Sequence, residues 1–274
     1  MSLELIVDAR KKSIRLALLN NGKLIELHEE EGNNEFSVGD IYLGKVRKVV
    51  PSLNASFVNV GYDKDAFLHY LDLGPQFKSL NKFSRDTLRG KQNVSDLQYF
   101  KFEDEISKDG KIEETISSSA PILVQVTKEP ISSKGPRLTA EITLAGRFLV
   151  LVPFSNKVSI SQKIKSHGER DRLKTLIRKI KPKNFGVIIR TVAEGKKIKL
   201  LEQDLKNLLE KWKKIHENLL GIKPPMRVLS EIDKTSSILR DLLNAEFTNI
   251  HVNDKNLHEN LRQYVSDIAP GREK

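Results

Sequence analysis

Alternating apolar and polar positions mark the first strands of the chain. Residues 3–9, 13–19 and 23–28 alternate in this way, and an Asn-Asn-Gly turn at 20–22 separates the last two runs. Alternation with a period of two predicts β-strands, and an Asn-Gly turn between two such runs is a strong signal for a hairpin. The first 35 residues are therefore predicted to form three strands, and the second and third of these strands form a hairpin.

A second group of short strands is predicted further along the chain. Turn residues set their boundaries, at Pro51-Ser52 and at Gly61-Tyr62-Asp63. Short strands at close spacing favour a small barrel. The predicted strands cover 41–50, 54–60, 66–70 and 121–128.

The segment 75–117 lacks the patterns seen on either side of it. Its residues are polar, charged and only weakly periodic. Long stretches of this kind are usually loops with a function of their own or flexible segments. We therefore expect an insertion or a mobile loop on the rim of the barrel.

After residue 128 the pattern changes to a mixture of strands and helices. The apolar runs 136–145 and 148–153 predict a hairpin around Gly146, and Ser166-x-x-Glu169 predicts the capping box of a helix that ends before Pro182. The remaining predicted elements are a strand at 185–191, helices at 196–219 and 230–243, a strand at 247–252 and a helix at 254–268.

Composition limits the class of protein. The chain has 274 residues, 38% of them apolar and 30% charged, which is typical of an ordinary globular protein; this length corresponds to about two domains. It contains no Cys, which excludes disulfides, thiolate zinc sites, iron–sulfur clusters and a cysteine nucleophile, and fits a reducing compartment. No targeting or membrane-spanning segment is visible, so we expect a cytoplasmic protein.

The positive charge is concentrated in one segment. The chain carries 47 Lys and Arg against 36 Asp and Glu, a net charge of +11. Residues 138–235 hold 22 of the basic and 10 of the acidic residues, a charge of +12, whereas residues 1–35 and 236–274 are slightly acidic. Much of the excess lies at 163–183 and 196–214, on the outer faces of two predicted helices. These faces are either solvated surfaces or a binding surface for a polyanion such as RNA.

Two phenylalanines are predicted to lie on the outer face of the barrel. Val58 and Val60 suit the core face of their strand, so Phe57 faces outward, and Phe67 likewise falls on a polar face. Two outward rings on neighbouring strands suit base stacking. The alternative is that both rings pack against a neighbouring domain. Phosphate contacts could come from the basic residues of the preceding strand, Lys45, Arg47 and Lys48.

A second candidate site follows the strand at 185–191. The strand ends in Arg190-Thr191, and a loop with Gly195 leads to the next predicted helix. A guanidinium, a hydroxyl and backbone N–H groups at a helix start can bind one phosphate, so the site suits a terminal phosphate. The alternative is a capping box, Thr191-x-x-Glu194, with Arg190 paired to a surface carboxylate.

At these residues the sequence resembles the amino-terminal half of the ribonuclease E/G family. The resembling blocks run in family order along nearly the whole chain, except for 75–117. They are Ile41-Tyr-Leu-Gly-Lys-Val46, Pro51-Ser-Leu-Asn-Ala-Ser-Phe-Val-Asn-Val-Gly61, Ala66-Phe-Leu-His69, Leu144-Ala-Gly-Arg-Phe-Leu-Val-Leu-Val-Pro153, Ile189-Arg-Thr191 and Ile238-Leu-Arg-Asp241.

The resemblance implies an α+β fold, in which an S1 (OB-fold) β-barrel and a mixed α/β 5′-sensor are inserted into a split RNase H-like domain. Residues 1–35 plus 236–274 would form the split RNase H-like domain. Residues 36–137 would form the S1 RNA-binding domain, with the polar insertion at about 75–117. Residues 138–235 would form the 5′-sensor region.

The resemblance also implies roles for particular residues. RNA would contact Phe57, Phe67 and the basic residue after the barrel, Lys134; Lys45 is added as an RNA-binding residue because of its place on the preceding strand. A 5′-monophosphate would bind Arg190 and Thr191, together with backbone amides of the hairpin strand, for which the matching positions are Gly146 and Val150.

In the family, the catalytic aspartates that hold magnesium and the zinc-binding Cys pair lie in a DNase I-like domain that follows the split domain. No Asp pair in the last segment of this chain has that context. We therefore expect no catalytic and no metal-binding residue within these 274 residues, and expect the catalytic domain to follow Lys274. Whether residues 1–274 are a natural protein or a fragment stays open.

Two functions are compatible with these observations. The first is the RNA-binding, 5′-monophosphate-sensing part of an endoribonuclease that cleaves single-stranded RNA with Mg²⁺ in RNA processing and decay. The second is a complete, non-catalytic S1-type protein that acts on RNA or ribosomes. The resemblance adds a possible homo-oligomer, and single-stranded RNA with a 5′-monophosphate as the preferred partner.

Overall fold

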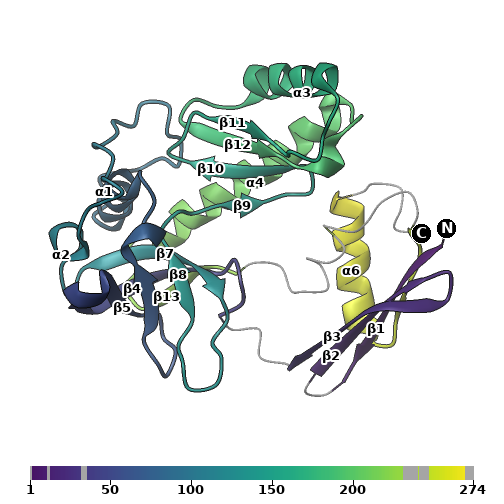
Figure 1. Ribbon diagram of the computed structural model, residues 1–274, viewed down its shortest axis with the longest axis horizontal. Helices are drawn as coiled ribbons and strands as arrows, with labels where there is room; N and C mark the ends of the chain where they lie inside the picture. Colours follow the sequence, from purple (N-terminus) through teal and green to yellow (C-terminus); the bar gives the residue numbers. More distant parts are fainter. Residues whose placement is uncertain (1, 11–12, 32–35, 231–239, 241–246, 269–274) are drawn as a thin grey trace. The chain divides into compact units, whose positions relative to one another are not determined.

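The computed structural model describes the chain except for residues 1, 11–12, 32–35, 231–239, 241–246 and 269–274 (Figure 1). The chain divides into two units: unit 1 contains Met1–Glu35 and Ile232–Lys274, and unit 2 contains Phe36–Glu231. Both units combine strands and helices, so the fold is α+β, as the sequence predicts. None of the helices in the described part of the chain is long and apolar enough to span a membrane.

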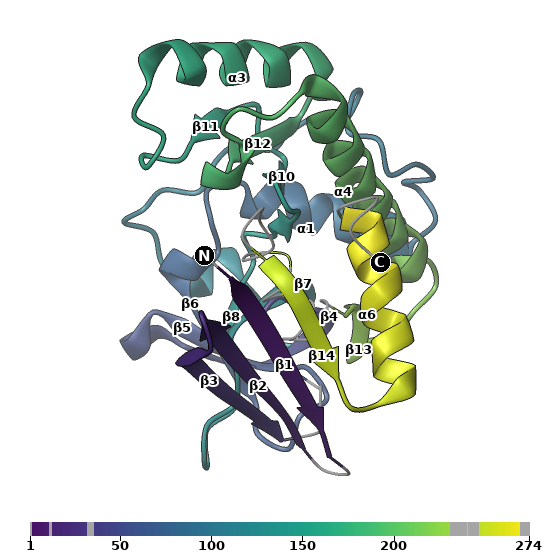
Figure 2. The same ribbon diagram turned by 90° about the vertical axis from the view of Figure 1, so that its right-hand side faces the viewer.

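In its described residues, unit 1 is a four-stranded sheet with a helix packed on it (Figure 2). The strand order is β14-β1-β2-β3; β1 pairs in parallel with β14 and antiparallel with β2. Leu261 and Val265 of the helix share a core with Leu5, Val7 and Leu16 of the sheet. The elements, all predicted from the sequence, are β1 (Leu3–Ala9), β2 (Ser13–Asn20), β3 (Lys23–Glu31), β14 (Phe247–Val252) and α6 (Lys255–Ile268).

The first part of unit 2 is a five-stranded β-barrel. Its strands are hydrogen-bonded in the order β4-β5-β6-β8-β7, and the pairing of β7 with β4 closes the ring. One further strand, which the sequence pattern does not predict, is β13 (Met226–Leu229), which pairs with the start of β4. The barrel strands are β4 (Ile41–Val50), β5 (Ala55–Asn59), β6 (Ala66–His69), β7 (Pro121–Lys128) and β8 (Arg137–Thr139).

The second part of unit 2 is a mixed sheet with two helices, in the strand order β11-β12-β10-β9 (Figure 1). Helix α3 contacts β11, and helix α4 packs against β9 and β10. The predicted cap of α3 is confirmed, because Ser166 Oγ accepts a hydrogen bond from the backbone N–H of Glu169. The elements are β9 (Leu144–Ala145), β10 (Leu149–Pro153), β11 (Val158–Ile160), α3 (His167–Ile180), β12 (Phe185–Ile189) and α4 (Ile198–Leu219).

The predicted single strand at 136–145 is wrong. Strand β8 ends at Thr139 and β9 begins at Leu144, so the chain leaves the barrel between them and enters the second sheet. Gln125 on β7 holds this crossing: its Nε2 donates to the carbonyls of Gly39 and Thr143, at 2.9 Å each, and its Oε1 accepts from the N–H of Thr143. The hairpin around Gly146 is formed by β9 and β10.

The segment 75–117 is not the mobile polar loop that its composition favours. It contains α1 (Phe77–Leu88) and α2 (Ile112–Thr115), and several of its apolar side chains are buried. The ring centroid of Phe83 lies 5.2 Å from that of Trp212 on α4 and 5.6 Å from that of Phe154 after β10. Trp212 Nε1 donates to the carbonyl of Ser95. The segment therefore packs between the barrel and the second sheet.

The predicted helix at 230–243 lies almost entirely outside the described residues. The assignment of the segments to RNase H-like, S1 and 5′-sensor domains stays a prediction.

Candidate nucleic-acid interface

Phe57 on β5 and Phe67 on β6 are direct cross-strand partners. Their ring centroids are 5.8 Å apart and the ring planes meet at 68°, which is an edge-to-face contact. Both side chains are half-buried, whereas Val58 and Leu68 beside them are fully buried. The alternation of the two strands therefore places both rings on the outer face of the barrel, where part of each ring is accessible to a base.

Basic residues on the two neighbouring strands lie next to the pair of rings, one on each side. Lys48 on β4 lies opposite Phe57, and Arg137 on β8 lies opposite Phe67. We call the row Lys48, Phe57, Phe67 and Arg137 the aromatic platform. Lys48 is exposed, and the guanidinium of Arg137 binds the Asp72 carboxylate, with Nη2 2.8 Å from Oδ2.

The strand register changes which lysine adjoins the rings. Lys45 is exposed but lies opposite Asn59, because an irregularity between Val46 and Lys48 shifts the pairing of β4 with β5. The sequence named Lys45, Arg47 and Lys48 as candidate phosphate contacts and assigned RNA binding to Lys45, whereas the register places Lys48 directly beside Phe57. It missed Arg137 as well, because the pairing of β8 with β6 joins strands that are distant in sequence.

Lys134 lies in the turn between β7 and β8, next to the platform. Ile131 and Lys134 exchange backbone hydrogen bonds of 3.0 and 3.3 Å, which close the turn. Gly135 then packs so tightly that a Cβ there would lie 2.4 Å from the carbonyl oxygen of Asp65. The next carbonyl, that of Pro136, accepts the N–H of Phe67 at 2.9 Å. These contacts hold the exposed Lys134 close to the start of β6.

The second site gathers at one end of the β10–β12 pair. Arg190 Nη1 donates to the carbonyl of Gly146 at 2.7 Å, and the backbone N–H of Arg190 donates to the carbonyl of Phe148 at 2.9 Å. The N–H of Gly146 donates to the carbonyl of Leu149, which closes the turn between β9 and β10. Val150 follows one residue later and pairs with Ile188 on β12. The structure thus brings Arg190 and Gly146 into contact, with Val150 close by.

Thr191 begins a short 3₁₀ turn, Thr191–Ala193, and its Oγ1 lies 2.8 Å from Ser161 Oγ. The alternative of a Thr191-x-x-Glu194 capping box is wrong. The residue before this turn is Arg190 and the residue before α4 is Lys197, and neither makes a side-chain cap. The Thr191 hydroxyl therefore contacts Ser161 and does not cap a helix.

Helix α3 holds the loop that follows Thr191. The carboxylate of Glu169 accepts the N–H of Gly195 at 2.8 Å and both Nε and Nη2 of Arg172 at 2.7 Å. The hydrogen bonds from Arg172 are the main cause that lowers the pKa of Glu169 to about 2, with a further lowering from Gly195 and an opposing effect of burial. The loop beside the Arg190 site is therefore fixed by an ionised carboxylate.

Sequence reasoning missed Asp204 on α4. Its carboxylate accepts the backbone N–H groups of residues 147, 148 and 149, which belong to the turn beside Arg190. Burial raises the pKa of Asp204, while these three hydrogen bonds and Arg190 act in the opposite direction. One feature of the sequence could have identified Asp204: it is an acidic residue on the same helix face as Leu201 and Leu208, which are buried.

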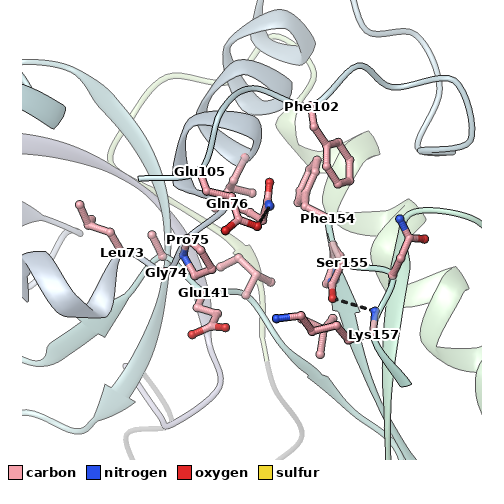
Figure 3. A pocket seen from close by; sticks show the side chains of 16 residues that line it. Leu73, Gly74, Pro75, Gln76, Phe102, Glu105, Glu141, Phe154, Ser155 and Lys157 are labelled. Carbon is pink, nitrogen blue, oxygen red and sulfur yellow. Dashed lines mark hydrogen bonds between the residues drawn. The ribbon is translucent and has the colours of Figure 1, made fainter. Parts of the chain in front are cut away.

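Unit 2 also contains a cavity of about 380 Å³, bounded on one side by the 75–117 segment (Figure 3). Phe102 and Phe154 form part of its wall, and Gln76 and Glu105, which share a hydrogen bond of 2.7 Å, form another part. Lys157 lines it from the side of the second sheet. None of the predicted site residues lines this cavity.

The described residues bring together no group of three or more His, Asp or Glu side chains that could hold a metal ion. The magnesium ion that the family resemblance implies is therefore not matched by a cluster of this size in the described part of the chain.

Comparison with known proteins agrees with the resemblance. Residues 143–274 match the family described as the Ribonuclease E/G family. The chain is 33% identical over 270 residues to ribonuclease G of Escherichia coli strain K12, covering 98% of this chain and 51% of that protein. It is 34% identical over 257 residues to ribonuclease E of Nostoc sp., covering 93% of this chain and 33% of that protein. It is 31% identical over 269 residues to ribonuclease G of Haemophilus influenzae, covering 98% of this chain and 51% of that protein.

A five-stranded barrel with paired outward aromatic rings is typical of OB-fold proteins that bind nucleic acids. The chain belongs to the ribonuclease E/G family. It spans about half the length of the ribonuclease G relatives that it matches.

Proposed function

We propose that this chain binds single-stranded RNA on the aromatic platform and recognises a 5′-monophosphate at Arg190 and Thr191. It would act as the RNA-binding and 5′-end-sensing part of an endoribonuclease of RNA processing and decay. The observation that carries this proposal is the hydrogen bond of 2.7 Å from Arg190 Nη1 to the Gly146 carbonyl, which unites residues 44 positions apart in one site.

The aromatic platform suits single-stranded RNA. A base stacked on an aromatic side chain gains about 1 to 3 kcal/mol, and every base offers a face for stacking. Lys48, Lys45 and Lys134 are exposed and can bind phosphates by releasing counterions. Binding here would be tolerant of sequence and sensitive to salt.

The Arg190 site suits a terminal phosphate. A guanidinium matches the geometry of phosphate oxygens, and the Gly146 carbonyl fixes its orientation. A 5′-monophosphate carries a charge of about −1.5 to −2 near neutral pH, whereas a 5′-hydroxyl carries none. Arg190 would therefore distinguish the two RNA ends through charge, with Thr191 as a hydroxyl partner beside it.

Both sites lie in unit 2, so one RNA molecule could occupy them together. Binding of the 5′ end would then raise the effective concentration of the following nucleotides at the platform. For the whole family protein we propose that this orientation presents a phosphodiester bond for hydrolysis. The described residues would take part through binding alone.

The test compares one short RNA made with a 5′-monophosphate or a 5′-hydroxyl. Arg190→Ala should reduce the preference for the 5′-monophosphate by about tenfold, as expected for loss of a charge-assisted contact, and leave binding of the 5′-hydroxyl RNA nearly unchanged. Arg178→Ala is the matched control, because Arg178 is exposed on α3 and the charge change is the same. Equal loss for both RNAs would make Arg190 a general phosphate contact and contradict 5′-end sensing.

A further inference from the structure

Asp204 places a carboxylate against the turn between β9 and β10. On helix α4, Leu201 and Leu208 are buried three residues before and four residues after it, so Asp204 faces the same way. An acidic residue on the apolar face of a helix needs partners that replace water. Asp204 finds them in the backbone of the turn.

Three successive backbone N–H groups converge on this carboxylate. Oδ1 accepts the N–H of Arg147 at 3.0 Å, and Oδ2 accepts those of Phe148 and Leu149 at 2.8 and 2.9 Å. Successive N–H groups that point to one place form a concavity of the kind that binds anions. In this protein, the chain's own carboxylate occupies that concavity.

The same turn determines where the guanidinium of Arg190 lies. The Gly146 carbonyl accepts Arg190 Nη1 at 2.7 Å, and the Phe148 carbonyl accepts the backbone N–H of Arg190 at 2.9 Å. The charge of Asp204 also attracts Arg190. A contact path therefore leads from Asp204 through the turn to Arg190.

The position of Gly146 agrees with this arrangement. A Cβ at Gly146 would lie 2.6 Å from Oδ2 and 2.7 Å from Oδ1 of Asp204. Contacts this short would force the turn and the carboxylate apart. The absence of a side chain at residue 146 is what lets Asp204 reach the three N–H groups.

We propose that Asp204 is a positioning residue of the phosphate site: it fixes the turn 146–149 and, through the Gly146 carbonyl, orients Arg190 before phosphate binds. The inference rests on the proposed function of Arg190. It further means that the N–H groups of residues 147–149 do not bind the 5′-phosphate, since Asp204 already takes them. A carboxylate also repels a phosphate, but the three N–H groups and Arg190 offset part of the charge of Asp204 and so reduce that repulsion.

The test again uses one RNA with a 5′-monophosphate or a 5′-hydroxyl. Asp204→Asn keeps the size of the side chain but turns one acceptor oxygen into a donor that faces an N–H group. We expect the preference for the 5′-monophosphate to fall about fivefold to tenfold, with binding of the 5′-hydroxyl RNA within about twofold. The control Glu202→Gln removes the same charge from the exposed side of the helix and should leave the preference unchanged.

A double variant separates positioning from a general effect on structure. If Asp204 acts through Arg190, Asp204→Asn adds no further loss of preference in an Arg190→Ala background. Asp204→Glu keeps the charge but moves the carboxylate by one methylene, so it should also lose preference for the 5′-monophosphate. It serves as the second variant if Asp204→Asn does not fold. Unchanged preference in the variant that folds, or equal loss for both RNAs, would overturn the inference.

Failure of the proposed function has a different signature. A wild-type chain without any preference for the 5′-monophosphate would overturn both proposals. If Arg190→Ala keeps the preference and Asp204→Asn loses it, then Arg190 is not the phosphate ligand, and Asp204 positions a different one.

Discussion

Phe57 and Phe67 face each other across β5 and β6, with their ring centroids 5.8 Å apart in an edge-to-face contact. Such a pair gains about 0.5 to 1.5 kcal/mol beyond the area that it buries. Each ring therefore restricts the other, and a base that stacks here does not have to order a free side chain first.

Removing the rings should weaken RNA binding without unfolding the chain. Phe57→Ala and Phe67→Ala should each reduce the affinity for single-stranded RNA by about 1 to 3 kcal/mol, because a stacked base loses its partner. Fluorescence anisotropy with a labelled RNA measures the affinity, and thermal melting followed by circular dichroism checks the fold. Tyr99→Ala is the control, since Tyr99 is 88% exposed and does not belong to the platform. Loss of folding in the double variant would instead make the rings part of a structural core.

The register of β4 predicts a ranking of two lysines. Lys48 lies opposite Phe57, whereas Lys45 lies opposite Asn59, so Lys48→Ala should weaken RNA binding more than Lys45→Ala. Loss of a phosphate contact should lower the slope of log Kd against log salt concentration by about 1. The control is Lys108→Ala, an exposed lysine in the 75–117 segment, which should leave the slope unchanged. A larger effect of Lys45→Ala would contradict the platform as defined here.

Sequence patterns correctly predicted the features that depend on residues close together in the chain. Alternation predicted the outward rings of Phe57 and Phe67, and the spacing of Ser166 and Glu169 predicted the start of α3. The irregularity after Val46 changes the register without a mark in the sequence, so the sequence did not show that Lys48 rather than Lys45 lies opposite Phe57.

Other features depend on partners that no local pattern reveals. The apolar residues of 75–117 are dispersed, and the partners of Phe83 lie on α4 and after β10, far along the chain. The place of Asp204 on the apolar face of its helix is a signal, but its partners are backbone N–H groups, which are present at every residue except proline and so cannot be identified from the sequence.

Burial of Phe83 predicts that the 75–117 segment stabilises unit 2. Phe83 is fully buried and its ring adjoins those of Phe100, Phe154 and Trp212. Phe83→Ala should lower the free energy of unfolding by about 3 to 5 kcal/mol, because a large cavity replaces the ring. Urea unfolding followed by tryptophan fluorescence reports on Trp212 directly, and Tyr99→Ala in the same segment should have little effect. Unchanged stability of Phe83→Ala would mean that the segment is not packed as described.

The hydrogen bonds that Glu169 accepts from Arg172 and Gly195 predict a pH dependence of stability. Its pKa is lowered from 4.5 to about 2 in the folded chain, chiefly by the hydrogen bonds from Arg172. Because the folded pKa is the lower one, the stabilisation is complete above pH 4.5 and is lost as the pH falls towards 2. At neutral pH, Glu169→Gln should lower the free energy of unfolding by about 1 to 2 kcal/mol, a value reduced for solvent screening of this partly exposed pair.

The decisive measurement is the difference in unfolding free energy between Glu169→Gln and wild type as a function of pH. The difference should shrink as the pH falls below 4.5, because wild type loses the charged acceptor that the variant lacks at every pH. Glu194→Gln is the matched control, since Glu194 is exposed in the same loop. A difference that stays constant down to about pH 3 would show that the carboxylate charge does not hold Gly195, and the loop beside Thr191 would then need another cause for its position.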